Sequence, residues 1–190
     1  MQSLARPGTN VTGMTTLLDV LVAKHVELLV EAVPRMSRVA FLNYTALPND
    51  PLANLAASAE KVAKSAAATK GLTLAIASFH DPESVRQAFA QFEKARSEGI
   101  VVVATGPTVQ FRHEILGHAK RLRLPTISGL TPPWMDAGGT FNYGPIFAEI
   151  YRTAATYVDK ILKGAKPADL PVQQPTKFEF IVNLRAAKEI

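Results

Sequence analysis

The sequence contains no cysteine among its 190 residues. This absence excludes disulfide bonds, thiolate catalysis and cysteine-based zinc sites, and it fits a reducing or an oxidising compartment equally well. Long apolar runs are also missing. No stretch approaches the roughly 18 apolar residues of a membrane span, and the first eight residues lack the apolar core of a signal peptide. As written, we expect the chain to stay in the cytoplasm.

Long blocks of lysine and arginine are absent too, although 21 basic residues face 16 acidic ones. Such blocks are typical of tails that bind nucleic acid or membranes. The densest basic cluster lies on one predicted helix and comprises Arg112, His113, His118, Lys120, Arg121 and Arg123. It has no interleaved aromatic residues for base stacking. A solvated helix face is therefore the favoured interpretation, and we predict no nucleic-acid partner.

Apolar residues make up 47% of the chain, which is enough to bury the core of one domain or somewhat more. Strand and helix patterns alternate up to residue 144. Strands are predicted at 37–42, 72–78, 100–104, 125–128 and 140–143, and helices at 16–33, 51–70, 81–98 and 109–122. This alternation predicts an α/β fold, with a doubly wound, mainly parallel sheet and helices on both faces.

The pattern changes after residue 144. Residues 145–163 form the strongest amphipathic helix in the sequence, and Gly164 ends it. Three prolines follow, then a strand over 178–182 and a helix from Leu184 to the last residue. We therefore expect 145–190 to be a separate segment with an apolar face of its own.

No motif in the sequence argues for catalysis. Gly8 and Gly13 have the spacing of a phosphate-binding loop, but Met14 stands where that loop requires lysine. His113 and His118 lie about 140° apart around a helix, so they do not form a metal-binding pair. We predict a protein that is not an enzyme and that has no cofactor or metal.

The loops at the carboxyl ends of the strands hold the candidate binding residues, because ligands of open α/β sheets bind there. The candidates are Asn43, Tyr44, Thr105, Gly106, Ser128, Asn142 and Tyr143. The alternative is that asparagine, glycine and serine are simply the residues of turns. Trp134 is a rim contact or, in the favoured interpretation, a loop anchor.

Three stretches together resemble the substrate-binding proteins of ABC transporters, which have the periplasmic-binding type I fold. They are residues 4–13 (LARPGTNVTG), 137–145 (AGGTFNYGP) and 155–171 (ATYVDKILKGAKPADLP). The last is the most specific, and the similarity extends over essentially the whole chain. Thr9 stands where this family usually has glycine.

The resemblance implies two α/β lobes that close on a small organic solute, often an amino acid or a related compound, and deliver it to an ABC permease. Residues 1–13 would cross between the lobes, 14–144 would form the second lobe, and 145–190 would return to the first. Full-length members are periplasmic. Because the first lobe is not in this sequence, we expect a fragment whose exposed C-terminal helix forms a homodimer.

A second function stays open at this point. The same fold would suit a stand-alone cytoplasmic module that senses a ligand or binds a partner, similar to the effector domains of sugar-responsive repressors.

Overall fold

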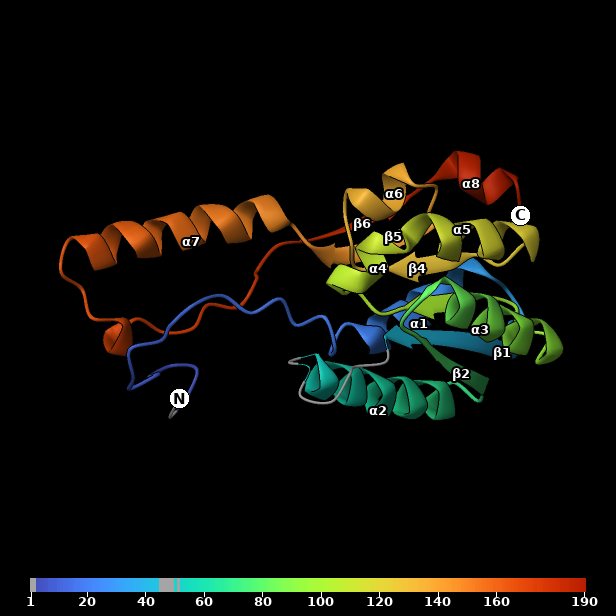
Figure 1. Ribbon diagram of the computed structural model, residues 1–190, viewed down its shortest axis with the longest axis horizontal. Helices are drawn as coiled ribbons and strands as arrows, with labels where there is room; N and C mark the ends of the chain where they lie inside the picture. The colour runs from blue at the N-terminus through green and yellow to red at the C-terminus, as the bar shows by residue number, and fades with distance from the viewer. Residues whose placement is uncertain (1–2, 45–49, 51) are drawn as a thin grey trace. The chain divides into compact units, whose positions relative to one another are not determined.

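The chain forms a sheet of six strands flanked by helices in a computed structural model, which describes residues 3–44, 50 and 52–190 (Figure 1). Internal contacts divide it into two units. Unit 1 combines residues 1–17 with 145–179, and unit 2 combines residues 18–144 with 180–190.

The strand order of the sheet is β2-β1-β3-β4-β5-β6. The strands are β1 (Arg38–Tyr44), β2 (Thr73–Phe79), β3 (Ile100–Val102), β4 (Thr126–Ser128), β5 (Phe141–Pro145) and β6 (Phe178–Val182). The pairs from β2 through to β5 are all parallel. The α/β fold class predicted from the alternating pattern is therefore confirmed.

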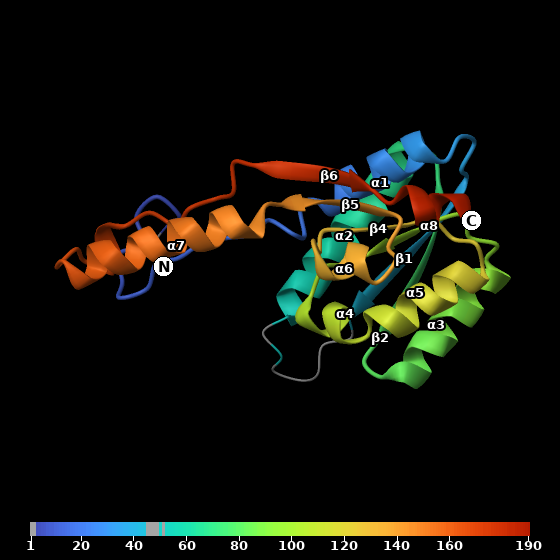
Figure 2. The same cartoon turned by 90° about the horizontal axis from the view of Figure 1, so that it is seen from above.

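Helices cover both faces of this sheet (Figure 2). Unit 2 contains α1 (Val22–Ala32), α2 (Ala53–Thr69), α3 (Pro82–Lys94), α4 (Gly106–Gln110), α5 (Arg112–Arg121), α6 (Pro133–Asp136) and α8 (Leu184–Lys188). Buried side chains of α1 and α2 share one core with alternate residues of β1 and β3. Side chains of α3, α5 and α6 form the second core on the opposite face.

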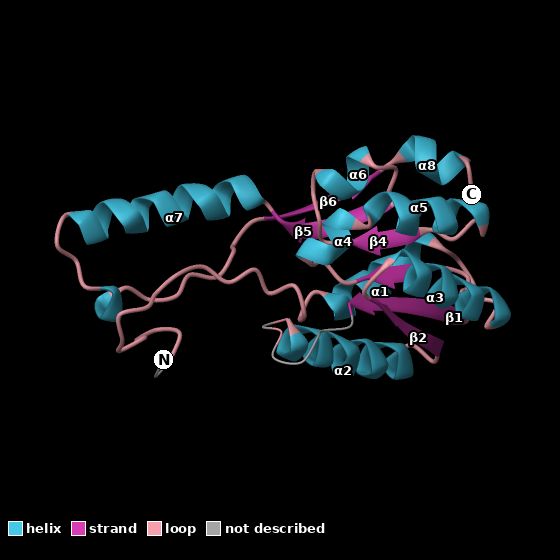
Figure 3. Ribbon diagram, viewed as in Figure 1, coloured by secondary structure: helices cyan, strands magenta, loops and turns pink. Residues whose placement is uncertain are grey.

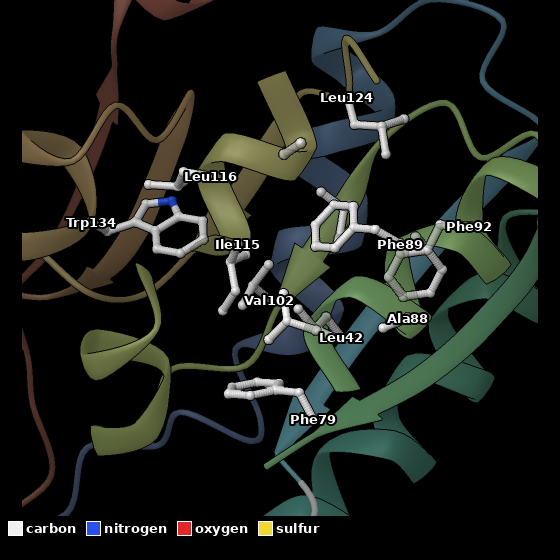
Figure 4. Close-up of a cluster of buried hydrophobic side chains, with 14 of the residues drawn as sticks. Leu42, Phe79, Ala88, Phe89, Phe92, Val102, Ile115, Leu116, Leu124 and Trp134 are labelled. Atoms are coloured by element: carbon white, nitrogen blue, oxygen red, sulfur yellow. The ribbon is translucent and has the colours of Figure 1, made fainter. Parts of the chain in front are cut away.

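The second core is the richer in aromatic residues (Figure 4). Phe79, Phe89, Phe92 and Trp134 are all fully buried in it. Phe89 and Phe92 meet edge to face, with their ring centroids 5.6 Å apart. Fully burying a side chain of this size stabilises the fold by roughly 1.5–3 kcal/mol.

Local sequence signals account for helix α3 most fully. The Asp81 carboxylate accepts a hydrogen bond from the backbone N–H of Ser84 at 2.7 Å, and the Ser84 hydroxyl accepts one from the Asp81 N–H at 3.0 Å. This reciprocal pair is a capping box, and Pro82 fits the first turn. The predicted start of the helix is confirmed, but the helix ends at Lys94 rather than at residue 98.

Two helix predictions need correction. The helix predicted from residue 16 begins at Val22, because Leu17 has a φ of 55° and leaves the helical region. The spacing of Thr16 and Asp19 also predicts a capping box at the start of this helix, but the Asp19 carboxylate instead accepts a hydrogen bond from the Ser58 hydroxyl at 2.6 Å. The helix predicted over 109–122 is two helices, α4 and α5, which meet at Phe111.

The predicted start of helix α2 is only partly within the described residues. The sequence predicts Asn49 or Asp50 as its cap and Pro51 in its first turn, and of these Asn49 and Pro51 lie outside the described residues. Asp50 does contribute, because its carboxylate accepts a hydrogen bond from the Leu52 N–H at 2.8 Å.

Unit 1 consists of helix α7 (Phe147–Leu162), a short 3-10 helix η1 (Pro167–Asp169) and extended chain (Figure 3). The N-terminal segment runs beside residues 168–173. Thr12 donates from its hydroxyl to the carbonyl of Leu170 at 2.7 Å, and Met14 forms a parallel bridge with Gln173. The Tyr157 hydroxyl ties α7 to the same segment by donating to the carbonyl of Pro171 at 2.6 Å.

The units differ in extent from the domains expected from the sequence. Residues 14–17 group with unit 1, and residues 180–190 group with unit 2 rather than with α7. The reason lies in three contacts at the edge of unit 2. The Asn183 N–H donates to the carbonyl of Thr140 at 2.9 Å, Phe180 stacks on Phe141, and Lys120 pairs with Glu189. The assignment of these parts as lobes stays a prediction.

Candidate functional site

The strand order reverses between β1 and β3. The chain passes from β1 outward to β2, and then returns to place β3, β4 and β5 on the other side of β1. In open α/β sheets the carboxyl ends of the strands at such a reversal border the ligand-binding crevice. The pairing of Leu42 with Val102 puts the end of β1 beside the chain that leaves β3. Tyr44 at the end of β1 and Thr105 after β3 therefore both lie at the carboxyl ends of these two neighbouring strands.

Asn43 lies in β1 with only 3% of its surface exposed. Its side-chain N–H donates to the carbonyl of Ala56 in α2 at 2.8 Å, and its side-chain oxygen accepts from the Tyr44 N–H at 2.9 Å. These bonds tie the first turns of α2 to the strand. The amide of Asn43 is therefore committed to the scaffold that carries the edge.

Tyr44 is half-buried and closes the end of β1. Its ring meets Phe79 edge to face with centroids 5.9 Å apart, and Phe79 meets Phe111 in the same way at 5.8 Å. This aromatic row holds the tyrosine ring in a defined position at the reversal point.

Thr105 and Gly106 begin helix α4. The Thr105 hydroxyl accepts from the Thr108 N–H at 3.2 Å, and the Thr108 hydroxyl donates to the carbonyl of Val103 at 2.6 Å. Both threonines are buried. Gly106 is exposed, and a Cβ atom built there would have no neighbour within 4 Å. Gly106 thus offers free space at the carboxyl edge.

Ser128 is the last residue of β4, and Gly129 follows it. Ser128 is fully buried and donates from its hydroxyl to the carbonyl of Val102 at 2.9 Å, which clamps β4 to β3. Gly129 lies close to β5, because a Cβ atom on Gly144 would come within 2.9 Å of the Gly129 carbonyl oxygen. Ser128 is therefore a structural residue of the edge.

Asn142 differs from the other candidates. It is fully buried in β5 opposite Ser128, and neither atom of its side-chain amide has a hydrogen-bond partner among the described residues. Leaving a buried polar atom unpaired costs about 1–3 kcal/mol. The Trp134 indole N–H and the Thr131 hydroxyl are also buried without a partner in the same part of the chain. Four of the six buried side-chain atoms without a partner among the described residues thus belong to residues 131–142.

Tyr143 is joined to helix α1 by His25. The Nε2 atom of His25 lies 2.6 Å from the Tyr143 carbonyl oxygen, so this nitrogen carries the proton and donates it. The two rings meet edge to face with centroids 6.3 Å apart. Burial lowers the pKa of His25 to about 4, so the ring is neutral at pH 7. His25 therefore positions β5 rather than carrying charge.

The described part of the chain holds no group of three histidine or acidic side chains arranged to bind a metal ion. Within the same residues, no helix combines the length and the apolar character needed to cross a membrane.

A family model described as ABC transporter substrate binding protein matches residues 1–190. The chain belongs to this family. Its members are generally binding proteins rather than enzymes, in accord with the lack of a catalytic motif in the sequence. The resemblance predicted from residues 4–13, 137–145 and 155–171 is therefore confirmed. No curated protein matches the chain.

Solved structures of the family's fold are similar over the whole chain. A conserved domain protein from Vibrio cholerae has 25% identity and a TM-score of 0.87. An ABC domain in complex with L-Trp from Streptococcus pneumoniae has 19% identity and a TM-score of 0.82. A ligand-free, open substrate-binding protein with adhesive properties from Clostridium difficile has 19% identity and a TM-score of 0.70. Each covers 100% of this chain, which spans 60%, 62% and 61% of them respectively.

The structure brings the candidate residues to one edge of the sheet, but it gives them different roles. Asn43, Thr105 and Ser128 use their polar groups internally, whereas Tyr44 and Gly106 lie at the surface of the edge. Sequence reasoning missed His25, because a single histidine on an apolar helix face gives no signal of its distant partner. Trp134 is fully buried and therefore serves as an anchor.

Proposed function

We propose that the chain forms one lobe and the connecting segments of the solute-binding component of an ABC importer. The match of the family model along residues 1–190 carries this proposal. It also favours the importer over the stand-alone sensing module that the sequence leaves open. The solute is a small organic molecule of the amino-acid class, and the chain transforms nothing chemically.

The solute surface of this proposal is the carboxyl edge at the β1–β3 reversal. Tyr44 offers an aromatic ring held by Phe79, and Gly106 leaves room for an approaching ligand. Asn43, Thr105 and Ser128 hold the edge in shape. The half-buried Tyr143 completes the proposed set, and Asn142, which is fully buried beside it, supports the edge from within. The similar ABC domain from Streptococcus pneumoniae was solved in complex with L-Trp, which supports an amino-acid solute.

A second lobe supplies the rest of the site in the whole protein. The chain spans about three-fifths of the matched structures, so the remaining part of such a protein has room for that lobe. An isolated lobe encloses its solute on one side only, and we therefore expect it to bind weakly. The whole protein passes its solute to an ABC permease and works outside the cytoplasmic membrane, as family members do.

Self-association through α7 is the second part of the proposal. Tyr151, Val158 and Leu162 on this helix are 70%, 56% and 82% exposed. A row of large apolar side chains in water favours association, and a second copy of α7 offers the same surface. We expect a homodimer, and light scattering at several concentrations tests it.

The solute surface is tested by nuclear magnetic resonance titration of the chain with amino acids, purines, sugars and small carboxylates at millimolar concentration. We expect amino acids to shift resonances of residues at the carboxyl edge. Gly106→Leu should abolish these shifts, because its side chain occupies the free space. Gly117→Leu is the matched control, since Gly117 is also exposed in a helix with no neighbour within 4 Å.

Two results would contradict the proposal. Equal shifts in wild type and Gly106→Leu would place the solute elsewhere. Shifts produced only by sugars, and unaffected by either substitution, would refute both the amino-acid class and the proposed surface.

A further inference from the structure

In unit 2 the chain passes from each helix into the amino end of the next strand. These amino ends lie opposite the carboxyl ends that form the proposed solute surface. Strands β1, β3 and β4 are parallel and consecutive in the sheet, so their amino ends lie in one row. Arg35 precedes β1, Arg96 precedes β3 and Arg123 precedes β4. Adjacent strands are about 4.8 Å apart, so the amino ends of these three strands span about 10 Å. Arg35 follows α1 on one face of the sheet, whereas Arg96 and Arg123 follow α3 and α5 on the other. We call this set the arginine edge.

All three arginines have the left-handed backbone conformation that favours glycine. Their φ angles are 68°, 53° and 52°, and Gly71 has a φ of 68° at the equivalent junction before β2. Arg96 and Arg123 end α3 and α5 in the same way, with paired hydrogen bonds back to the last helical turn. A side chain in this conformation is destabilising, and arginine does not share the tolerance of asparagine. The chain therefore has an arginine in a strained backbone conformation at three junctions between a helix and the next strand.

The backbone at the centre of this edge is held in place. The Arg38 guanidinium donates to the carbonyl of Arg96 at 2.7 Å and pairs with Glu98. The Glu98 carboxylate in turn accepts from the N–H groups of Ser37 and Arg38 at 2.7 and 3.0 Å. The turn that carries the Arg96 side chain is therefore held by the hydrogen bonds of Arg38 and Glu98.

The charges of the arginine edge are free within the described part of the chain. Arg35, Arg96 and Arg123 are exposed there and form no ion pair. Helices α3 and α5 lie side by side, and a groove of about 330 Å³ between their ends is lined by Arg96, Arg121 and Arg123. Glu93 is the one carboxylate among its lining residues.

We propose that the arginine edge binds the phosphate groups of an anionic lipid surface. A row of separate cations suits an extended array of phosphates better than one small anion, and guanidinium groups match phosphate oxygens in pairs. Nucleic acid is less suited, because Phe92, the groove's aromatic residue, is fully buried and unable to stack on bases. This binding is independent of the solute surface at the opposite edge.

The test is sedimentation of the chain with vesicles at about 50 mM salt. Vesicles of phosphatidylglycerol and phosphatidylcholine are compared with vesicles of phosphatidylcholine alone. Each basic side chain near an anionic surface strengthens binding about fivefold. We expect the triple variant Arg35→Asn, Arg96→Asn, Arg123→Asn to lose about a hundredfold in binding to anionic vesicles. Asparagine tolerates the left-handed conformation, so this variant should stay folded, as circular dichroism checks.

The matched control is Lys61→Gln, Lys160→Gln, Lys166→Gln, which removes the same charge from exposed positions on other parts of the chain. It should lose less than about threefold. Equal losses in the two variants, or equal wild-type binding to neutral vesicles, would overturn the proposal. So would tighter binding of a single-stranded oligonucleotide that depends on the same three arginines, because the partner would then be nucleic acid.

Discussion

Helices α3 and α7 are both amphipathic, but only α3 buries its apolar face. In α3, Val85, Phe89 and Phe92 are fully buried against the sheet and α5. In α7, which is three residues longer, Tyr157 is the buried residue. An apolar stripe therefore predicts a helix, whereas the presence of a partner decides how much that helix contributes to stability.

The largest expected effect tests this contrast directly. Phe89→Ala should lower the free energy of unfolding by about 3–5 kcal/mol, because it leaves a cavity in a closed core. Tyr151→Ala on α7 should change it by less than about 0.5 kcal/mol in the dilute, monomeric chain, since that ring is 70% exposed there. Urea unfolding measures both, followed by the fluorescence of Trp134 for unit 2 and by circular dichroism for the helix of unit 1. A loss above about 2 kcal/mol for Tyr151→Ala would show that α7 is covered in solution.

Acid should weaken unit 2 through His25. Its pKa falls from 6.5 to about 4 on folding, so the unfolded chain takes up a proton first. The stability that the neutral ring provides is fully present above pH 6.5 and is lost as the pH falls to 4, by about 3 kcal/mol.

His25→Gln keeps a donor for the Tyr143 carbonyl and removes the titration. The variant should therefore lose less stability than wild type between pH 7 and pH 4, as measured by urea unfolding at several pH values. His113→Gln, at an exposed histidine, is the control. An unchanged pH profile in His25→Gln would refute this role.

Self-association of α7 should respond to a smaller change. Leu162→Glu places a charge on the most exposed apolar residue of the helix and should weaken dimer formation at least tenfold, or about 1.4 kcal/mol. Sedimentation equilibrium gives the dissociation constant. Lys163→Glu, one residue further on, is the control. A wild-type chain that stays monomeric at high concentration would refute self-association through α7.

The smallest effects are expected at the helix ends. Arg96→Gly and Arg123→Gly relieve left-handed strain but add flexibility to the unfolded chain, so each should stabilise unit 2 by only about 0.5 kcal/mol. Gly164→Ala at the end of α7 should be destabilising instead, because Gly164 has a φ of 99°. Thermal unfolding compares the three. Destabilisation by both arginine substitutions would mean that these side chains make contacts that outweigh the strain.

Sequence reasoning succeeded where the signal is local. The capping box of Asp81 and Ser84 lies within four residues, and strand β6 has the predicted bounds Phe178–Val182. It failed where the local structure depends on a residue far away in the sequence. The Asp19 carboxylate, which the sequence predicts to form a capping box with Thr16, accepts a hydrogen bond instead from Ser58, far along the chain.

The candidate site shows the same limit. The sequence placed Asn43 in a loop after a strand, whereas the structure has it within β1. Ser128 ends β4 as predicted, and Thr105 lies beyond the end of β3 as the N-cap residue of α4. The sequence could not show that their polar groups turn inward to carbonyls of Ala56 and Val102 or to the start of α4. A polar residue at a strand end serves the scaffold or a ligand equally well, and only its neighbours in space distinguish the two.

The close approach of Gly129 and Gly144 has a consequence for motion. Their backbones touch where no side chain fits, and β5 is also tied to α1 by the hydrogen bond of His25. Moving Gly144 would require strands β4 and β5 to part. A bend where the chain leaves unit 2 after Gly144 would therefore lie at Pro145 or later, so a substitution at residue 144 would alter the sheet first.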